Sequence, residues 1–156
     1  MILAFAHPCL VVNDLDKAVD FYCKMFHFSK LSDEGWHNSL GHDIATGLKN
    51  SSCKGVMLKG HNCFLEIFQF DNSSSDERNE PIPADALGIR HLAFFVDNEF
   101  DECERFSLLG GEYLGQPVGD AVYMRDPFGN IIELCEIPTP EEDPRVLPGI
   151  SDLNRG

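Results

Sequence analysis

Two histidines and two glutamates occupy matching positions in the two halves of the chain. His7 and His91 each lie near the head of an apolar run, and Glu66 and Glu133 each lie inside a later apolar run. Two imidazoles and two carboxylates suit a divalent ion, and with one dication they give a neutral site that limits the cost of burying charge. Without an ion, two facing carboxylates would repel each other and one would have to be protonated. We therefore predict one site with all four as ligands, whose donor types fit Zn, Ni, Co, Mn or Fe(II) without selecting among them.

Each of these residues also has a plainer interpretation. A lone histidine in an apolar strand is more often a hydrogen-bonded core residue than a ligand, and the two glutamates could face solvent on edge strands. The recurrence of the His and Glu in both halves of the chain is what favours the metal.

The histidines are predicted to lie on β-strands, residues 2–12 and 88–97. The second has the sequence GIRHLAFFVD, with the aromatic and β-branched residues typical of a strand. Because strand side chains alternate, His91, Ala93 and Phe95 should share one face. His7 should lie in the same way on the first strand, where Pro8 removes a ladder donor and favours an edge or a bulge.

The glutamates are predicted to lie on the last strand of each half, FLEIFQF at 64–70 and NIIELCEI at 130–137. Apolar positions at helical spacing predict helices over 15–27 and 98–109. Residues 28–31, 55–58, 112–116 and 121–125 complete the strands, and 32–50 is expected to be a strand plus a mobile loop.

The fold class is therefore α+β, with two βαβββ modules. Neither module can bury both faces of its sheet alone, so the His and Glu face of one should meet its counterpart or enclose a cavity with it. We assign residues 1–70 to the first module, 71–84 to a Ser- and Pro-rich linker, 85–137 to the second module and 138–156 to a tail.

Composition narrows the partners and the compartment. The chain has 156 residues, 43% of them hydrophobic, and a net charge of −14, which disfavours nucleic acid and anionic membranes. No apolar run reaches the ~20 residues of a membrane-spanning helix. The six cysteines show no CxxC spacing, and we expect a cytoplasmic protein.

Four segments of the chain resemble the vicinal oxygen chelate superfamily, which includes glyoxalase I, methylmalonyl-CoA epimerase, extradiol dioxygenases and fosfomycin-resistance transferases. They span residues 6–136 and read AHPCLVVNDLDKAVDFYCKMF, FLEIFQF, GIRHLAFFVDN and YMRDPFGNIIELCE. The resemblance implies paired βαβββ modules that form a U-shaped metal cleft. It places the family's ligand positions at His7, Glu66, His91 and Glu133.

The order His-Glu-His-Glu is most similar to bacterial-type glyoxalase I. That resemblance implies a lyase or isomerase of lactoylglutathione lyase type, which acts on a small oxo or hydroxy substrate through a metal-bound enediolate. Glu133 would be the first choice of base, with Glu66 as its near-symmetric partner. An extradiol dioxygenase would use only His7, His91 and Glu133, an epimerase usually has an amide at position 66, and a non-catalytic ligand-binding or resistance protein is a further alternative.

The substrate pocket departs from that of the glutathione-binding glyoxalases. Their Arg on the first strand corresponds to Val11 here, and their Asn after the strand-four Glu corresponds to Phe70. Phe64, Phe68 and Phe95 are expected to line the site, and Tyr123 to offer a hydroxyl. This lining favours an apolar or aromatic small molecule. We expect a homodimer, and the cleft could close within one chain or across two.

Overall fold

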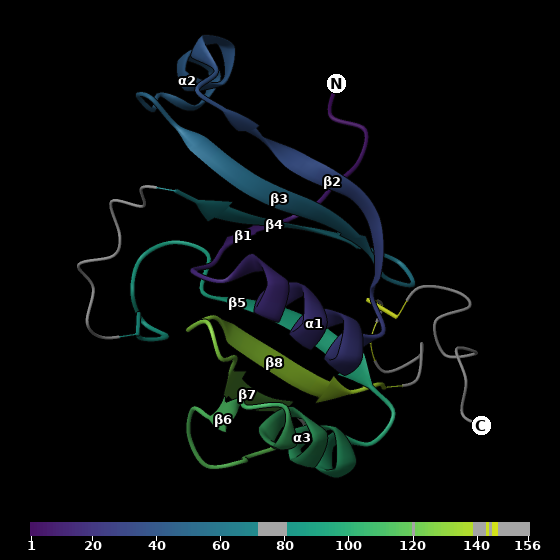
Figure 1. Cartoon of the computed structure of the whole chain (residues 1–156). Coiled ribbons are helices and arrows are strands. Elements are labelled where there is room, and N and C mark those ends of the chain that lie inside the picture. The colour runs from purple at the N-terminus through teal and green to yellow at the C-terminus, as the bar shows by residue number, and fades with distance from the viewer. Residues whose placement is uncertain (72–80, 120, 139–142, 144, 147–156) are drawn as a thin grey trace. The chain divides into compact units, whose positions relative to one another are not determined.

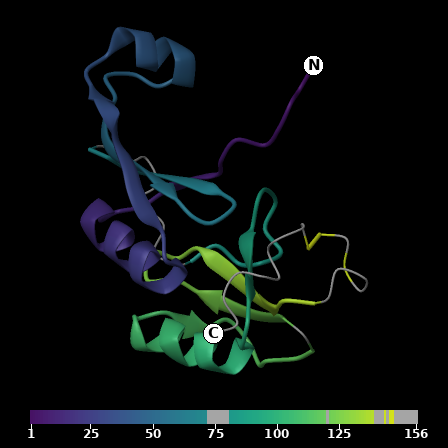
Figure 2. The same ribbon diagram turned by 90° about the vertical axis from the view of Figure 1, so that its right-hand side faces the viewer.

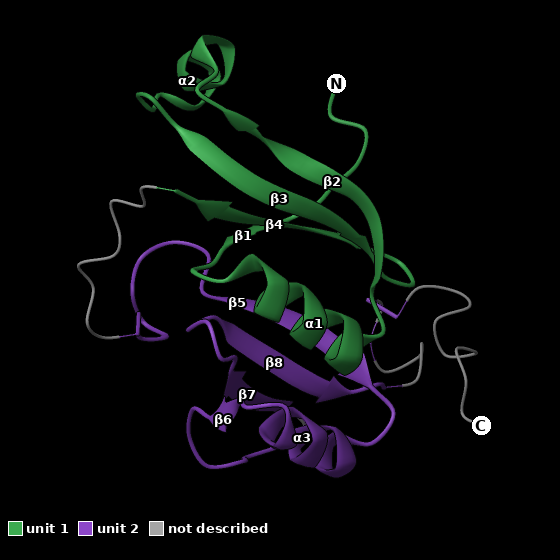
Figure 3. Ribbon diagram, in the orientation of Figure 1, with its two compact units in different colours: residues 1–80 green, residues 81–156 purple. Residues whose placement is uncertain are grey.

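A computed structural model describes residues 1–71, 81–119, 121–138, 143, 145 and 146. The chain divides into two compact units, residues 1–80 and 81–156 (Figure 3). Each unit contains one four-stranded sheet and follows the order βαβββ, which confirms the α+β prediction. The predicted linker lies outside the described residues from 72 to 80, as does most of the predicted tail.

The sheet of the first unit has the strand order β1-β4-β3-β2, and β1 runs parallel to β4 while the other pairs are antiparallel. Its β3–β4 hairpin confirms the predicted one. The elements of this unit are β1 (Cys9–Val11), α1 (Leu15–Phe26), β2 (Ser29–His37), α2 (Leu40–Thr46), β3 (Ser52–Lys59) and β4 (Phe64–Phe70).

Helix α1 begins where the sequence predicts. The Asp14 side chain caps it by accepting a hydrogen bond from the Lys17 backbone N–H at 3.1 Å, and His27 ends it in the left-handed conformation. The apolar side of the helix is buried, with Tyr22 and Ala18 both at 0% exposure. It contacts β2, β3 and β4 and so covers one face of the sheet.

The first strand is much shorter than predicted. We expected residues 2–12, and the strand covers only Cys9–Val11. Its neighbour β4 begins at Phe64, and Cys9 lies opposite Glu66, so the ladder has no partner residues to extend much further back. Pro8 also has no N–H to donate, although its carbonyl accepts from the Glu66 N–H at 3.0 Å. His7 therefore lies just before the strand, which is an edge strand as expected.

The segment predicted as a strand plus a mobile loop, residues 32–50, contains a short helix that the sequence did not reveal. Ser39 caps α2, and the Asp43 carboxylate accepts the backbone N–H groups of Asn50 and Ser51 at 2.7 and 3.0 Å. No α2 residue is buried, so this helix has no apolar face against the sheet that periodicity could detect.

The sheet of the second unit repeats the arrangement of the first, in the order β5-β8-β7-β6, with β5 parallel to β8. Helix α3 is capped by Asn98, and Gly110, at φ 99°, follows its end, as the sequence predicts. The predicted strand 112–116 is reduced to two residues. The elements are β5 (His91–Val96), α3 (Glu99–Leu108), β6 (Glu112–Tyr113), β7 (Ala121–Arg125) and β8 (Ile131–Glu136).

Each long helix lies along one face of its own sheet, as Figures 1 and 2 show for α1 and α3. Alternation then separates the strands into a buried and an open side. In β8, Ile132 and Leu134 are fully buried, whereas Glu133 and Cys135 between and beyond them are only partly covered. Within the described residues, no helix has the length and apolar character needed to cross a bilayer.

We predict that Leu134→Ala lowers the free energy of unfolding by about 2–5 kcal/mol, because it opens a cavity beneath α3. Leu134 is 0% exposed, whereas Leu87 is 100% exposed and provides the control. Chemical denaturation should show Leu87→Ala within about 0.5 kcal/mol of the native chain. Equal effects of the two substitutions would contradict the assignment of the core.

Candidate metal centre

In the second unit, the structure brings His91 and Glu133 into direct contact. The Nε2 atom of His91 lies 2.9 Å from Oε2 of Glu133. The parallel register places Ala93 opposite Glu133, and His91 shares a strand face with Ala93. The two side chains are 41% and 15% exposed, so the imidazole is accessible and the carboxylate is mostly covered.

In the first unit, His7 and Glu66 form a corresponding pair. The Nε2 atom of His7 lies 3.6 Å from Oε2 of Glu66. Cys9 lies opposite Glu66 in the parallel β1–β4 ladder. In both units, therefore, the residue opposite the glutamate comes two positions after the histidine, and the same register produces both pairs.

The spacing of the donor atoms fits two neighbouring ligands of one ion. Metal–ligand bonds of about 2.0–2.2 Å place adjacent donors roughly 3.0–3.5 Å apart in tetrahedral or octahedral coordination. The observed separations of 2.9 and 3.6 Å lie close to that range. One imidazole and one carboxylate are thus available in each unit as half of a metal site.

Glu133 is held by neighbours on its own sheet. The Cys135 thiol donates a hydrogen bond to Glu133 Oε1 at 3.1 Å. Tyr123 lies opposite Glu133 in the β7–β8 register, and its ring meets the His91 ring edge-on, with centroids 5.4 Å apart. Burial and then a hydrogen bond to Glu133 raise the pKa of Tyr123. These contacts fix one carboxylate oxygen and leave Oε2 toward the imidazole.

A thiol accompanies the glutamate in each unit. Burial, followed by the charge of Glu66, raises the pKa of Cys9 to about 12. Burial, followed by the hydrogen bond to Glu133, raises the pKa of Cys135 to about 12. Both groups are therefore protonated at neutral pH, as hydrogen-bond donors to a carboxylate must be.

The three phenylalanines of the predicted lining lie on the strands that bear the pairs. Phe64 is 40% exposed, and Phe68 and Phe95 are half-buried. The Phe68 ring lies over Gly55, where a Cβ atom would come within 2.3 Å of it. Only glycine leaves room for this ring beside Glu66 on the open face of the sheet.

Two residues near these faces were missed by the sequence analysis. Trp36 packs edge-on against Phe68, with centroids 5.6 Å apart, and only a longer β2 than predicted would have placed it there. The Arg145 guanidinium lies over the Phe95 ring, 5.9 Å from its centroid. Nothing in the Pro-rich tail sequence signals that contact.

The four predicted ligands are brought together as two pairs. Within the described residues, no group of three or more His, Cys, Asp or Glu side chains gathers to hold an ion. The four-ligand centre therefore stays a prediction.

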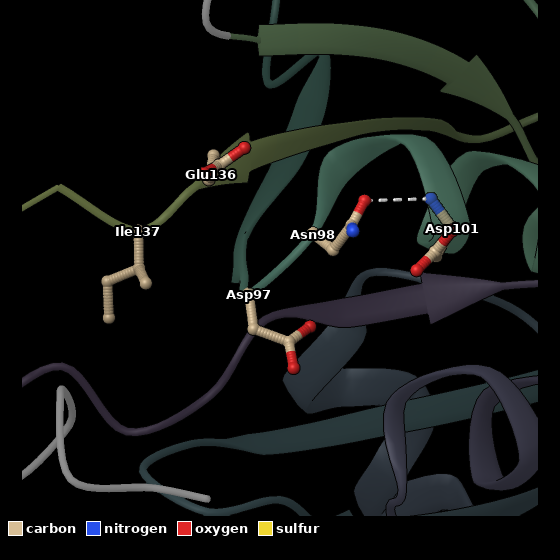
Figure 4. A pocket seen from close by; sticks show the side chains of 5 residues that line it. All are labelled: Asp97, Asn98, Asp101, Glu136 and Ile137. Carbon is tan, nitrogen blue, oxygen red and sulfur yellow. Dashed lines mark hydrogen bonds between the residues drawn. The ribbon is translucent and has the colours of Figure 1, made fainter. Parts of the chain in front are cut away.

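A separate cavity of about 400 Å³ lies in the second unit where β5 and β8 end and α3 begins (Figure 4). It is not part of the metal centre, since Glu136 and Glu133 lie on opposite faces of β8. The Asn98 side chain is already used to cap α3, by accepting from the Asp101 N–H at 3.1 Å. The lining residues are Asp97, Asn98, Asp101, Glu136 and Ile137.

The turn before β8 fixes the start of the strand that bears Glu133. The buried Asp126 carboxylate accepts from the backbone N–H of Phe128 and of Asn130, at 3.0 and 2.7 Å, and from the Asn130 side chain at 2.9 Å. Gly129 has φ 91°, a conformation that favours glycine. This confirms the predicted turn at 126–130.

Comparison with known proteins agrees with this geometry. The model of the Glyoxalase/Bleomycin resistance protein/Dioxygenase superfamily matches residues 4–134. The chain therefore belongs to that superfamily, as the resemblance of its sequence motifs implied.

Among curated relatives, a probable lactoylglutathione lyase of Synechocystis sp. is 24% identical over 136 residues, covering 83% of this chain and 92% of that protein. A glyoxalase family protein from Bacillus cereus has a similar structure, with a TM-score of 0.76, 20% identity and coverage of 87% of this chain and 95% of its own. The fosfomycin resistance protein FosX from Listeria monocytogenes, solved with Mn(II) and 1S,2S-dihydroxypropylphosphonic acid, gives 0.61, 23%, 91% and 98%. At these identities the two structures establish the shared fold.

We predict that Asp126→Ala lowers the free energy of unfolding by about 1–3 kcal/mol, because it leaves buried N–H donors of the turn without their acceptor. Thermal and urea unfolding would measure the loss. The exposed Asp85 provides a control, and Asp85→Ala should leave stability nearly unchanged. A turn that tolerates Asp126→Ala equally well would show that this carboxylate does not hold the start of β8.

Proposed function

We propose that the chain is a divalent-metal-dependent lyase or isomerase of glyoxalase type. Its substrate would be a small molecule with neighbouring oxo or hydroxy groups, and its ligands would be His7, Glu66, His91 and Glu133. The observation that carries the proposal is the recurrence of one His–Glu pair at the same register in both units. The similarity to a probable lactoylglutathione lyase supports the same reaction class.

In this proposal the two modules, residues 1–70 and 85–137, act together as one functional domain. Each module supplies half of the coordination sphere, from the same chain or from a second copy in a homodimer. The donor set would accept Zn, Ni, Co, Mn or Fe(II), all of which bind imidazole and carboxylate. An ion bound there would supply Lewis acidity to two adjacent substrate oxygens and so acidify a neighbouring C–H bond.

Glu133 is the proposed base. Its carboxylate would take the proton from one substrate carbon and return it to the adjacent carbon, and Glu66 is its near-symmetric partner. Cys135 and Tyr123 act on Glu133 and not on the substrate, because their hydrogen bonds hold the carboxylate in place. Phe64, Phe68 and Phe95 would exclude water around the reacting carbons and favour an apolar or aromatic substituent.

A dioxygenase is the second candidate. The superfamily name includes such enzymes, and the aromatic side chains beside Glu66 and Glu133 would suit a catechol ring. That reaction would need only His7, His91 and Glu133 as ligands. It offers no role for a carboxylate at position 66 that lies within contact distance of His7.

A substrate screen on metal-loaded protein tests the reaction. We expect turnover of a hemithioacetal or a related oxo compound with tightly bound Ni, Co or Zn. Oxygen consumption on a catechol with Fe(II) would favour the dioxygenase instead. Bound ligand without turnover, in metal-free protein, would contradict both enzymatic proposals.

We predict that Glu133→Gln lowers kcat by about 10²–10⁴-fold, because the amide cannot accept a proton. Glu136 lies on the same strand but the opposite face, so Glu136→Gln is the matched control and should keep nearly native kcat. Steady-state kinetics on both variants, after circular dichroism verifies their fold, measures the difference. Loss of activity in both would point to a damaged strand and not to a base.

We predict that Glu66→Gln weakens metal binding by about tenfold or more, a loss that removal of even an outer partner of a ligand causes. Proton transfer should fall with it under the lyase proposal. Calorimetric metal titration and kinetics on the same preparation provide the two readouts. Full retention of oxygen-dependent turnover in this variant would favour the dioxygenase and contradict the four-ligand centre.

A further inference from the structure

A short turn from the C-terminal region brings a cation onto the open face of the second unit. The Val146 N–H donates to the Asp143 carbonyl at 3.1 Å and closes the turn. Val146 is 4% exposed, so this hydrophobic side chain anchors the turn on the unit. Arg145, which comes just before Val146, is therefore held at a defined place.

The Arg145 side chain lies on an aromatic ring and pairs with one acid. Its guanidinium carbon is 5.9 Å from the centre of the Phe95 ring, a cation–π contact. Its Nε donates to both carboxylate oxygens of Asp143, at 3.0 and 2.8 Å, and Nη2 also contacts Asp143. Within the part of the chain that the structure describes, these bonds leave Nη1 available, and the side chain is 73% exposed.

Phe95 relates this cation to the metal pair. It alternates with Ala93 and His91 on one face of β5, and it lies opposite Cys135, two residues beyond Glu133. Arg145 is close enough to Glu133 and Cys135 for their charges to act on it electrostatically. The guanidinium, the imidazole and the carboxylate thus belong to the same face of one sheet.

A cation at this place matters in a chain with a net charge of −14, which repels anions in general. Val11 occupies the position where the glutathione-binding relatives resembled in sequence have arginine, and it cannot attract a carboxylate. A guanidinium offers two parallel N–H donors that match a planar oxyanion. Asp143 occupies that fork partly, from the solvent-exposed side of the turn.

We propose that Arg145 is a specificity-determining residue that binds a carboxylate at the end of the substrate remote from the metal-bound oxygens. The proposal rests on the proposed metal centre and adds the charge of the substrate to it. Asp143 is the built-in competitor for the guanidinium, and Phe95 holds the flat face of the cation while its edge meets the ligand.

Metal-chelating probes that differ in one distal group test this directly. The monohydroxamates of succinic, glutaric and adipic acid chelate a metal at one end and carry a carboxylate at the other. The corresponding monoamides have the same length and no charge. Calorimetry on Mn(II)-loaded protein should show that at least one carboxylate binds roughly tenfold more tightly than its amide.

Three variants assign that preference to Arg145. Arg145→Gln should abolish it while leaving Mn(II) affinity and amide binding unchanged. Asp143→Asn retains an oxygen for the Arg145 backbone N–H, which donates to Asp143 at 2.8 Å, and should raise the preference about two- to fivefold. Arg105→Gln removes the same charge from α3 on the covered face and should leave the preference intact.

Equal binding of carboxylate and amide at every length, with Mn(II) bound, would overturn the role of Arg145 alone. A preference that survives Arg145→Gln would also overturn it. A protein that binds neither Mn(II) nor any hydroxamate would instead contradict the proposed metal centre, and the two failures are therefore distinguishable.

Discussion

The structure depends on one repeated constraint, the parallel pairing of an edge strand with the strand that bears a glutamate. In each sheet the last strand inserts beside the first, and the register places an imidazole next to a carboxylate. Antiparallel neighbours on the other side and a helix on one face then hold that last strand in place. The His–Glu contact is thus a consequence of βαβββ topology as much as of the residues themselves.

The helices decide which side of each sheet is available for chemistry. α1 and α3 bury the apolar side of the strands and leave the glutamates on the other. A half-covered carboxylate beside a neutral imidazole has limited solvation, and the thiol and phenol that donate to Glu133 offset part of that cost. A divalent ion would neutralise what remains, which gives a physical reason to expect metal affinity at these pairs and not at the acidic cavity of Figure 4.

Features specified by local spacing were predictable from the sequence. The helix after Asp14 and the alternation around Glu66 follow from side-chain periodicity and capping, so both were found. The helix α2 has no buried face and Arg145 lies in a tail, so neither leaves a periodic signal. His7 was assigned to a strand because its neighbours are apolar, but strand length depends on the partner ladder and not on apolarity alone. The sharing of one ion by the two pairs depends on association of the two units, which no pattern within a strand specifies.

The proposed function requires that two half-sites complete a single coordination sphere. Counting bound ions by mass spectrometry on dialysed protein, for the native chain and for His7→Ala and His91→Ala, tests this requirement. We expect one tightly held ion per chain in the native protein and its loss in either variant. Two ions in the native protein, or retention of an ion after either substitution, would contradict a shared centre.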